Sequence, residues 1–287
     1  MRVAFHLVDV FAERPFEGNR LCVVPDPDPE LDAAMMATLA LEINFSETTF
    51  VTAVRPDGYD VRIFTPYSEL PFAGHPTLGT AFVLASLGRT GSWVTQVSRA
   101  GEVPVEVDVG AGRAAMTQLP AVFGREVTDR AAVAAAAGLE TTDLVDGLPI
   151  VPVSTGIAHL MIPVTDEATL RRATRHDSAA QVCAEAGEAE SLYLFAVRGR
   201  GDVLARMFDR DRGIGEDPAT GSAAGPLGAY LATHALAGMP GSVTIAQGEM
   251  ARRPSFLHVD VRGSGTRVGE IRVEGGVRSA GEGVFLL

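Results

Sequence analysis

Residues 76–87 read Pro-Thr-Leu-Gly-Thr-Ala-Phe-Val-Leu-Ala-Ser-Leu, and residues 219–236 read Ala-Thr-Gly-Ser-Ala-Ala-Gly-Pro-Leu-Gly-Ala-Tyr-Leu-Ala-Thr-His-Ala-Leu. Both stretches have a helical pattern without a charged face, and such a helix must be buried on all sides. Short runs of β-branched and aromatic residues, separated by Gly, Pro and Asp, flank both stretches. The sequence therefore predicts an α+β protein whose sheets wrap around two central helices.

The two helical stretches also resemble copies of each other. Gly74-His75-Pro76-Thr77 can be aligned with Asp217-Pro218-Ala219-Thr220, at a separation of 143 residues, which is half of the 287-residue chain. Upstream, Arg62-Ile63-Phe64 matches Arg206-Met207-Phe208 after a slip of one residue. This pattern favours a tandem duplication. Chance similarity between two helices rich in Gly and Ala is the alternative.

A duplication predicts two pseudo-symmetric halves, each a barrel-like, mostly antiparallel sheet around one buried helix. The boundary is expected in the turn-rich stretch near residue 120, which gives halves of residues 1–120 and 121–287; a return of the last strand to the first half is left open. Pro226 lies inside the second buried helix. Since proline removes a helical hydrogen bond, we expect a kink or a delayed helix start there.

Composition excludes several classes of protein. The net charge is −12, which argues against partners such as nucleic acid or an anionic membrane surface. All 24 basic residues are Arg. Without Lys, the chain cannot form a Schiff base with pyridoxal phosphate and has no Walker A lysine. No apolar run is long enough to span a membrane, and the first residues do not read as a signal peptide.

The cysteine content gives a further limit. The chain has two Cys, Cys22 and Cys183, which is too few for a disulfide framework or a thiolate zinc cage. The six His show no spacing typical of metal ligands, so we expect no metal site. Two buried thiols in a reducing compartment are the simplest interpretation, and they indicate a cytoplasmic protein.

The starts of the two buried helices are candidate anion sites. The first N–H groups of a helix lack partners and lie at the positive end of its dipole. Small residues let a ligand approach the backbone at Gly74 in one stretch and at Thr220, Gly221 and Ser222 in the other. Two such starts could bind a small carboxylate substrate without any Lys. Ordinary capping of two buried helices is an equally good interpretation.

Four polar residues are candidates for chemistry, and each has a plainer alternative. Glu47 precedes an apolar strand; burial would raise its pKa and fit it for proton transfer, whereas an exposed strand-end charge would have no role. His75 could polarise a substrate or be purely structural. Asp217 could hold a substrate amine or cap its helix. Asn19 could make a polar contact or occupy a turn.

Five motifs follow one another through most of the chain. They are Asp9-Val10-Phe11 with Gly18-Asn19, residues 44–50 (Asn-Phe-Ser-Glu-Thr-Thr-Phe), residues 64–66 and 69–79, residues 153–156, and residues 215–223 (Gly-Glu-Asp-Pro-Ala-Thr-Gly-Ser-Ala). On these motifs the sequence resembles the PhzF-like, phenazine-biosynthesis-type isomerases. The joint presence of Gly74-His75-Pro76-Thr77 and the last motif is the most specific part of the resemblance.

The resemblance implies a fold and a set of roles. The fold is diaminopimelate-epimerase-like, with the active site in the cleft between two halves, and family members are homodimers that need no cofactor. The best-known activity isomerises trans-2,3-dihydro-3-hydroxyanthranilate. Carried over by motif, Glu47 becomes the acid/base and His75, Asp217 and Ser222 contact the substrate, near Gly74 and backbone N–H groups.

Racemases of the same fold use two Cys, and neither Cys of this chain lies near Gly74 or Asp217 in the sequence. We therefore expect an isomerase that moves a proton and a double bond in a small cyclic amino or hydroxy carboxylate. An epimerase acting at a Cα carbon and a non-catalytic metabolite-binding protein are the alternatives. Arg20 and Pro226 depart from the family pattern, which leaves the identity of the substrate open.

Overall fold

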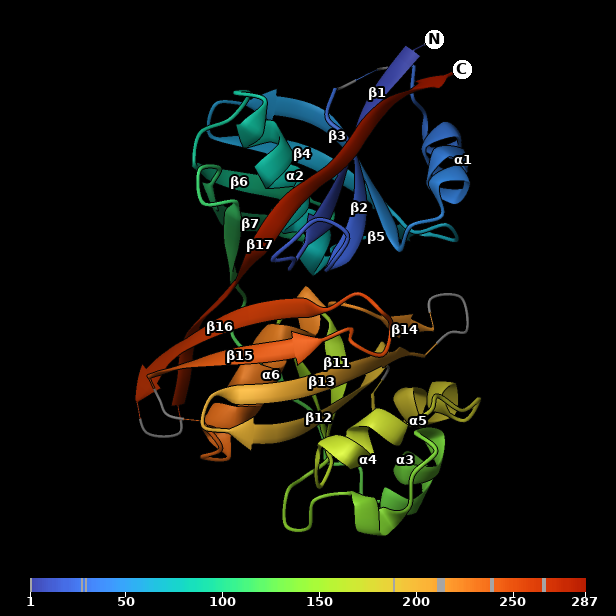
Figure 1. Ribbon diagram of the computed structural model, residues 1–287, viewed down its shortest axis with the longest axis vertical. Helices are drawn as coiled ribbons and strands as arrows, with labels where there is room; N and C mark the ends of the chain where they lie inside the picture. The colour runs from blue at the N-terminus through green and yellow to red at the C-terminus, as the bar shows by residue number, and fades with distance from the viewer. Residues whose placement is uncertain are drawn as a thin grey trace. The chain divides into compact units, whose positions relative to one another are not determined.

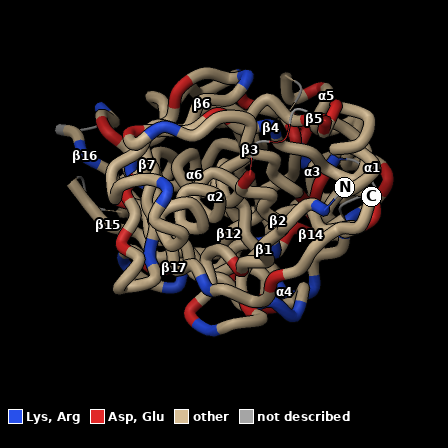
Figure 2. Tube along the Cα trace, turned by 90° about the horizontal axis from the view of Figure 1, so that it is seen from above, with Lys and Arg blue, Asp and Glu red and all other residues tan. Residues whose placement is uncertain are grey.

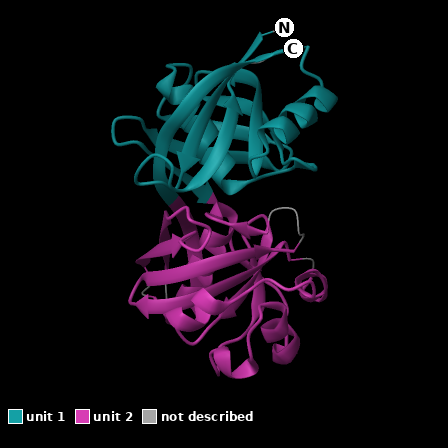
Figure 3. Cartoon of the chain, turned by 45° about the vertical axis from the view of Figure 1, so that its right-hand side comes forward, with its two compact units in different colours: residues 1–117, 274–287 teal, residues 118–273 magenta. Residues whose placement is uncertain are grey.

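The computed structural model describes residues 2–26, 28, 30–187, 189–210, 215–237, 240–264 and 267–287. The chain divides into two compact units (Figure 3): unit 1 comprises residues 1–117 and 274–287, and unit 2 comprises residues 118–273. Each unit combines a mainly antiparallel sheet with a buried helix (Figure 1). The predicted α+β class, with a barrel around a central helix, is confirmed.

Unit 1 contains a closed barrel of eight strands. Antiparallel pairs join β1 to β2, β3 to β4, β6 to β7 and β7 to β8, whereas β2–β3 and β4–β6 are parallel. Pairing of β17 with both β8 and β1 closes the ring. The strands are β1 (Arg2–Val10), β2 (Asn19–Val24), β3 (Glu47–Arg55), β4 (Gly58–Phe64), β6 (Trp93–Ser98), β7 (Gly101–Asp108), β8 (Arg113–Gln118) and the second part of β17 (Arg267–Leu286).

The helix α2 (Gly74–Ser86) occupies the interior of this barrel, and every residue from Gly74 to Leu84 is buried. Its small residues explain how it fits. A Cβ atom at Gly79 would lie 2.6 Å from a methyl group of Leu21 and 2.9 Å from one of Val10, so any other residue would require these side chains to shift. Outside the barrel, α1 (Ala33–Ile43) links β2 to β3, and the two-residue strand β5 (Glu69–Leu70) pairs with β4.

Unit 2 repeats the same order of elements and pairings. Antiparallel pairs join β9 to β10, β10 to β11, β12 to β13 and β15 to β16, whereas β11–β12 and β13–β15 are parallel. The parallel pairs flank helical connections, as they do in unit 1. The strands are β9 (Val122–Phe123), β10 (Val151–Ser154), β11 (Ala158–Pro163), β12 (Ser191–Gly199), β13 (Asp202–Asp209), β14 (Glu216–Asp217), β15 (Gly241–Gln247), β16 (Ser255–Ser264) and the first part of β17.

The central helix of unit 2 corrects the alignment made from sequence. α6 (Gly221–Thr233) has 13 residues, as α2 does, and Gly221 matches Gly74 at a separation of 147 residues. The predicted separation of 143, which paired Gly74 with Asp217, was therefore wrong for the helices. The connection from Phe208 to its partner Glu216 is three residues longer than that from Phe64 to Glu69, which shifts the register.

Pro226 lies within α6, and the helix continues through it from Gly221 to Thr233. The expected delay of the helix start does not occur. Residues Gly221 to Ala232 are all buried. Neither central helix carries a charged residue, as the uncoloured turns of α2 and α6 in Figure 2 illustrate.

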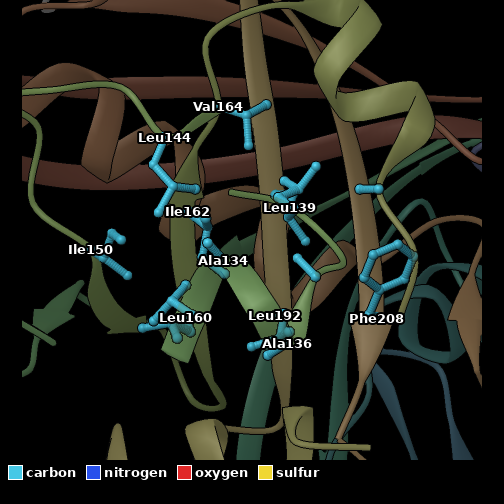
Figure 4. Close-up of a cluster of buried hydrophobic side chains, with 14 of the residues drawn as sticks. Ala134, Ala136, Leu139, Leu144, Ile150, Leu160, Ile162, Val164, Leu192 and Phe208 are labelled. Atoms are coloured by element: carbon cyan, nitrogen blue, oxygen red, sulfur yellow. The ribbon is translucent and has the colours of Figure 1, made fainter. Parts of the chain in front are cut away.

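Four short helical segments cover the outer face of the unit 2 sheet: α3 (Arg130–Ala136), η1 (Thr141–Asp143), α4 (Glu167–Arg172) and α5 (Ala179–Glu185). Apolar side chains from these segments and from β11 and β12 form a second core, part of which Figure 4 shows. Leu139, Leu144 and Leu170 belong to this core together with Leu160 and Leu192. Among the described residues, no helix has the length and apolar character needed to cross a membrane.

Candidate active site

Glu47 is the first residue of β3, where the chain leaves α1 and enters the barrel wall. Only 12% of its side chain is exposed. Burial raises the pKa of this carboxyl to about 7, and a hydrogen bond with Ser46 offsets the rise only in part. None of the ion pairs in the described part of the chain joins Glu47 to an Arg. Near neutral pH this carboxyl can therefore both accept and release a proton.

His75, the second residue of α2, lies next to Glu47: its Nε2 atom is 3.3 Å from Oε2 of the carboxyl. The other ring nitrogen, Nδ1, is 3.2 Å from the amide nitrogen of Asn19. The amide oxygen of Asn19 accepts a hydrogen bond from Ser46, which turns the amide nitrogen toward the ring. This contact with Asn19 leaves Nε2 as the ring nitrogen that faces Glu47.

The raised pKa of Glu47 predicts that the free energy of unfolding depends on pH. Unfolded Glu47 ionises near pH 4.5 and the folded protein near pH 7, so between these values the folded state holds a proton that the unfolded state has lost. The free energy of unfolding must therefore fall as pH rises through this window. We expect the stability of the wild type, measured relative to Glu47→Gln by urea denaturation, to fall by roughly 3 kcal/mol between pH 4.5 and 7.5. A pH-independent difference would contradict the assigned pKa.

In unit 2, a chain of hydrogen bonds leads to Asp217. The hydroxyl of buried Tyr193 donates to the amide oxygen of Gln247, 2.9 Å away. The amide nitrogen of Gln247 donates to the Thr220 hydroxyl and to the carbonyl oxygen of Asp217. Because Thr220 accepts from Gln247, its own hydrogen is directed to the Asp217 carboxylate, at 2.6 Å. These hydrogen bonds orient the carboxylate of Asp217, which lies in β14. Thr220 is the N-cap residue of α6.

Ser222, the second residue of α6, occupies the position that His75 has in α2. Its hydroxyl lies 3.0 Å from Nε2 of His159, a buried residue of β11. Nδ1 of the same ring lies 2.8 Å from the hydroxyl of Ser191 in β12. Burial lowers the pKa of His159 to about 3, so this ring is neutral at neutral pH.

The starts of the two central helices share one feature. Neither N-cap residue, Ala73 in α2 or Thr220 in α6, caps its helix with a side-chain hydrogen bond. Capping of these helices by other groups therefore stays an alternative to ligand binding. Their first N–H groups, at Gly74 and Gly221, carry the partial positive charge of a helix start.

The structure brings the predicted residues together in two groups. In unit 1, His75 at the start of α2 contacts Glu47 through one ring nitrogen and Asn19 through the other. The buried side chain of Asn19 makes this polar contact from β2, so Asn19 does not occupy a turn. Arg20 points to the other face of β2, where its guanidinium lies 4.8 Å from the ring centre of Phe45. Unit 2 groups the other predicted residues, Asp217, Thr220, Gly221 and Ser222, at the start of α6.

Other residues of these groups were not predicted. Sequence reasoning missed Ser46, Gln247 and His159, and it treated His159 only as a poor metal ligand. The contacts of His159 and Gln247 span 27 to 63 residues, so no local pattern could have marked them. Within the described residues, no cluster of three His, Cys, Asp or Glu side chains could hold a metal ion.

Comparisons with known proteins identify the family of this chain. A family model described as "Phenazine biosynthesis-like protein" matches residues 8–284. The chain is 35% identical over 280 residues to a Pseudomonas aeruginosa protein named trans-2,3-dihydro-3-hydroxyanthranilate isomerase, with 96% of this chain and 97% of that protein covered.

Solved structures extend this similarity to the fold. A protein from Pseudomonas aeruginosa described as a "predicted epimerase" is 36% identical, with a TM-score of 0.88 and 99% of both chains covered. A phenazine biosynthesis protein of the PhzF family from Bacillus anthracis is 26% identical, with a TM-score of 0.89 over the whole of both chains.

Proposed function

The chain belongs to the phenazine biosynthesis-like protein family, and we propose on this basis that it is an isomerase acting on a small cyclic carboxylate with amino or hydroxyl substituents. In the proposed reaction, a proton and a double bond change places within the ring. The geometry of Glu47 carries the proposal: a nearly buried carboxyl, with a pKa of about 7, faces Nε2 of His75 across 3.3 Å.

A single carboxyl is sufficient for such a reaction. The ionised form of Glu47 removes a proton from one ring carbon, and the electron pair of that C–H bond becomes part of a shifted double bond. The resulting carboxylic acid then gives the proton to a second carbon, at the far end of the shifted system. No atom is gained or lost, and Glu47 returns to its ionised form. His75, whose Nε2 lies 3.3 Å from the carboxyl, is proposed to favour that ionised form by donating a hydrogen to it.

The remaining residues are proposed to bind the substrate. The helix-start N–H group at Gly74 and those at Gly221 and Ser222 suit a carboxylate, because they offer donors and partial positive charge without a cation. Asp217, whose carboxylate is oriented by Thr220, suits a substrate amine or hydroxyl. Asn19 acts through His75, whose ring it orients.

The substrate proposed first is trans-2,3-dihydro-3-hydroxyanthranilate, because it gives its name to several relatives at 33–35% identity. Epimerisation at a Cα carbon is the second candidate, favoured by the 36% identical protein described as a predicted epimerase. Epimerisation needs a second acid on the opposite side of the reacting carbon. Homodimer formation and a cytoplasmic location stay predictions.

Incubation of the wild type with trans-2,3-dihydro-3-hydroxyanthranilate in heavy water tests the proposal. We expect a constitutional isomer with deuterium at no more than one ring carbon, measured by mass spectrometry and NMR, since one carboxyl handles one proton per turnover. An inverted stereocentre carrying deuterium, without movement of the double bond, would establish epimerisation instead. Recovery of the unlabelled substrate alone would refute the proposed substrate.

A further inference from the structure

His159 is the one histidine of unit 2 whose two ring nitrogens both meet serine hydroxyls, among the described residues. Its ring lies between Ser191 at 2.8 Å and Ser222 at 3.0 Å, and both His159 and Ser191 are buried, with 2% and 0% of their surfaces exposed. Ser222 lies in the first turn of α6, whereas His159 and Ser191 lie on the parallel neighbours β11 and β12. The sheet therefore holds the ring in place against the helix.

Hydrogen counting together with burial favours one direction for these two bonds. A neutral imidazole has one donor and one acceptor nitrogen, and a serine hydroxyl can donate one hydrogen. If Nδ1 carried the hydrogen, Ser191 would accept it, and the hydroxyl hydrogen of Ser191 would be left without an acceptor in a fully buried position, which is costly. If Nε2 carries it, Ser191 donates to Nδ1 and Nε2 donates to Ser222, and the hydrogen left over is that of Ser222, which is 8% exposed, rather than that of fully buried Ser191.

We propose that His159 is a positioning residue, which donates from Nε2 to the Ser222 hydroxyl and so directs the hydrogen of that hydroxyl toward an anionic group of the substrate. The inference rests on the proposed function, since it adds to the role of Ser222 in substrate binding. The hydroxyl then joins the N–H groups at the start of α6 as a third donor for a carboxylate.

Two further observations support this role. The pKa of His159 is about 3 because of burial, so the ring does not compete with Ser222 for the anion as a cation would, nor does it change with pH near neutrality. Tyr193, whose ring centre is 6.4 Å from that of His159, uses its hydroxyl on Gln247, which leaves Ser191 and Ser222 as the partners of the imidazole within the described residues.

Two substitutions separate the two contacts of His159. The amide group of Gln reaches the level of Nε2 and can still donate to Ser222, whereas the amide group of Asn reaches only the level of Nδ1 and keeps the contact with Ser191. We expect His159→Asn to raise KM for trans-2,3-dihydro-3-hydroxyanthranilate about 10- to 100-fold with kcat nearly unchanged, and His159→Gln to change KM only a few-fold.

Coupling to Ser222 distinguishes positioning from general structural damage. Ser222→Ala should raise KM as much as His159→Asn does, and the double variant should be no worse than Ser222→Ala alone, because both changes remove one interaction. Circular dichroism melting of each variant serves as the folding control. Additive losses in the double variant, or equal losses in the Gln and Asn variants, would overturn the proposal.

A readout without turnover keeps this inference separate from the proposed function. The ¹⁵N chemical shifts of His159 should identify a neutral Nε2–H ring from pH 5 to 8, with the Nε2 signal moved by Ser222→Ala and the Nδ1 signal moved by Ser191→Ala. A ring protonated on Nδ1, or a cationic one, overturns the inference even if the enzyme is active.

If the wild type does not convert trans-2,3-dihydro-3-hydroxyanthranilate, the proposed substrate fails, and calorimetric binding of 3-hydroxyanthranilate replaces KM as the measurement. Weaker binding by His159→Asn than by His159→Gln then supports the inference. No binding by the wild type refutes the part that assigns the Ser222 hydroxyl to an anionic ligand.

Discussion

Replacement of Glu47 by Gln should lower kcat with trans-2,3-dihydro-3-hydroxyanthranilate by about 10²–10⁴-fold, the range typical of general acid–base catalysis. Gln has nearly the same shape and can still contact Ser46 and His75, but it cannot accept a proton from carbon. Because 12% of the Glu47 side chain is exposed, a neutral amide should be tolerated without loss of folding. Steady-state kinetics, with circular dichroism to verify the fold, measure the effect.

Glu42→Gln is the matched control, because Glu42 is an exposed carboxyl on α1, the helix that leads to Glu47. This control should leave kcat and KM unchanged. Binding of 3-hydroxyanthranilate to the Glu47→Gln variant should also stay close to that of the wild type, since the helix-start donors are untouched. Undiminished turnover by Glu47→Gln would remove Glu47 from the mechanism.

Arg206→Met should destabilise the protein by about 3–5 kcal/mol, the cost of breaking a buried ion pair from one side. The Arg206 guanidinium binds both carboxylate oxygens of Glu216, at 2.9 and 2.6 Å, and donates to the carbonyl oxygens of Leu170, Arg171 and Ala173. Its side chain is only 7% exposed. Without it, one carboxylate and three carbonyl groups lose their partner.

The corresponding ion pair of unit 1, Arg62 with Glu69, provides the control for Arg206→Met. Arg62 makes the same two-bond contact with Glu69, at 2.9 and 2.8 Å, but its side chain is 30% exposed. Water can replace much of that interaction, so Arg62→Met should cost only about 1 kcal/mol or less. Urea denaturation followed by circular dichroism compares the two variants. Equal losses would show that burial does not set the strength of these pairs.

The sequence was sufficient to predict the architecture because its main signal is strong and local. Two uncharged helical stretches in a strand-rich chain indicate helices enclosed by sheets, and α2 and α6 confirm it. The register between the two halves could not be predicted so well. It depends on the length of the connection between Phe208 and Glu216, which no periodic pattern reports.

The candidate site shows the same division. Glu47, His75 and Asn19 occur in short motifs, and the structure places them in contact. The sequence around His159 predicts only a strand, because its proposed role depends on a contact with Ser222, which lies 63 residues further along the chain. Such contacts depend on the pairing of parallel strands and on the packing of a helix against them. Neither can be predicted from the residues next to His159.

The path of β17 has a consequence for the order in which the protein can fold during synthesis. Unit 2 is a continuous segment that is complete once residue 273 has left the ribosome. The barrel of unit 1 stays incomplete until residues 274–287 have been synthesised, because β1 must pair with β17. The half that begins the chain is therefore the last to be finished, and until then the edges of β1 and β8 stay unpaired on that side.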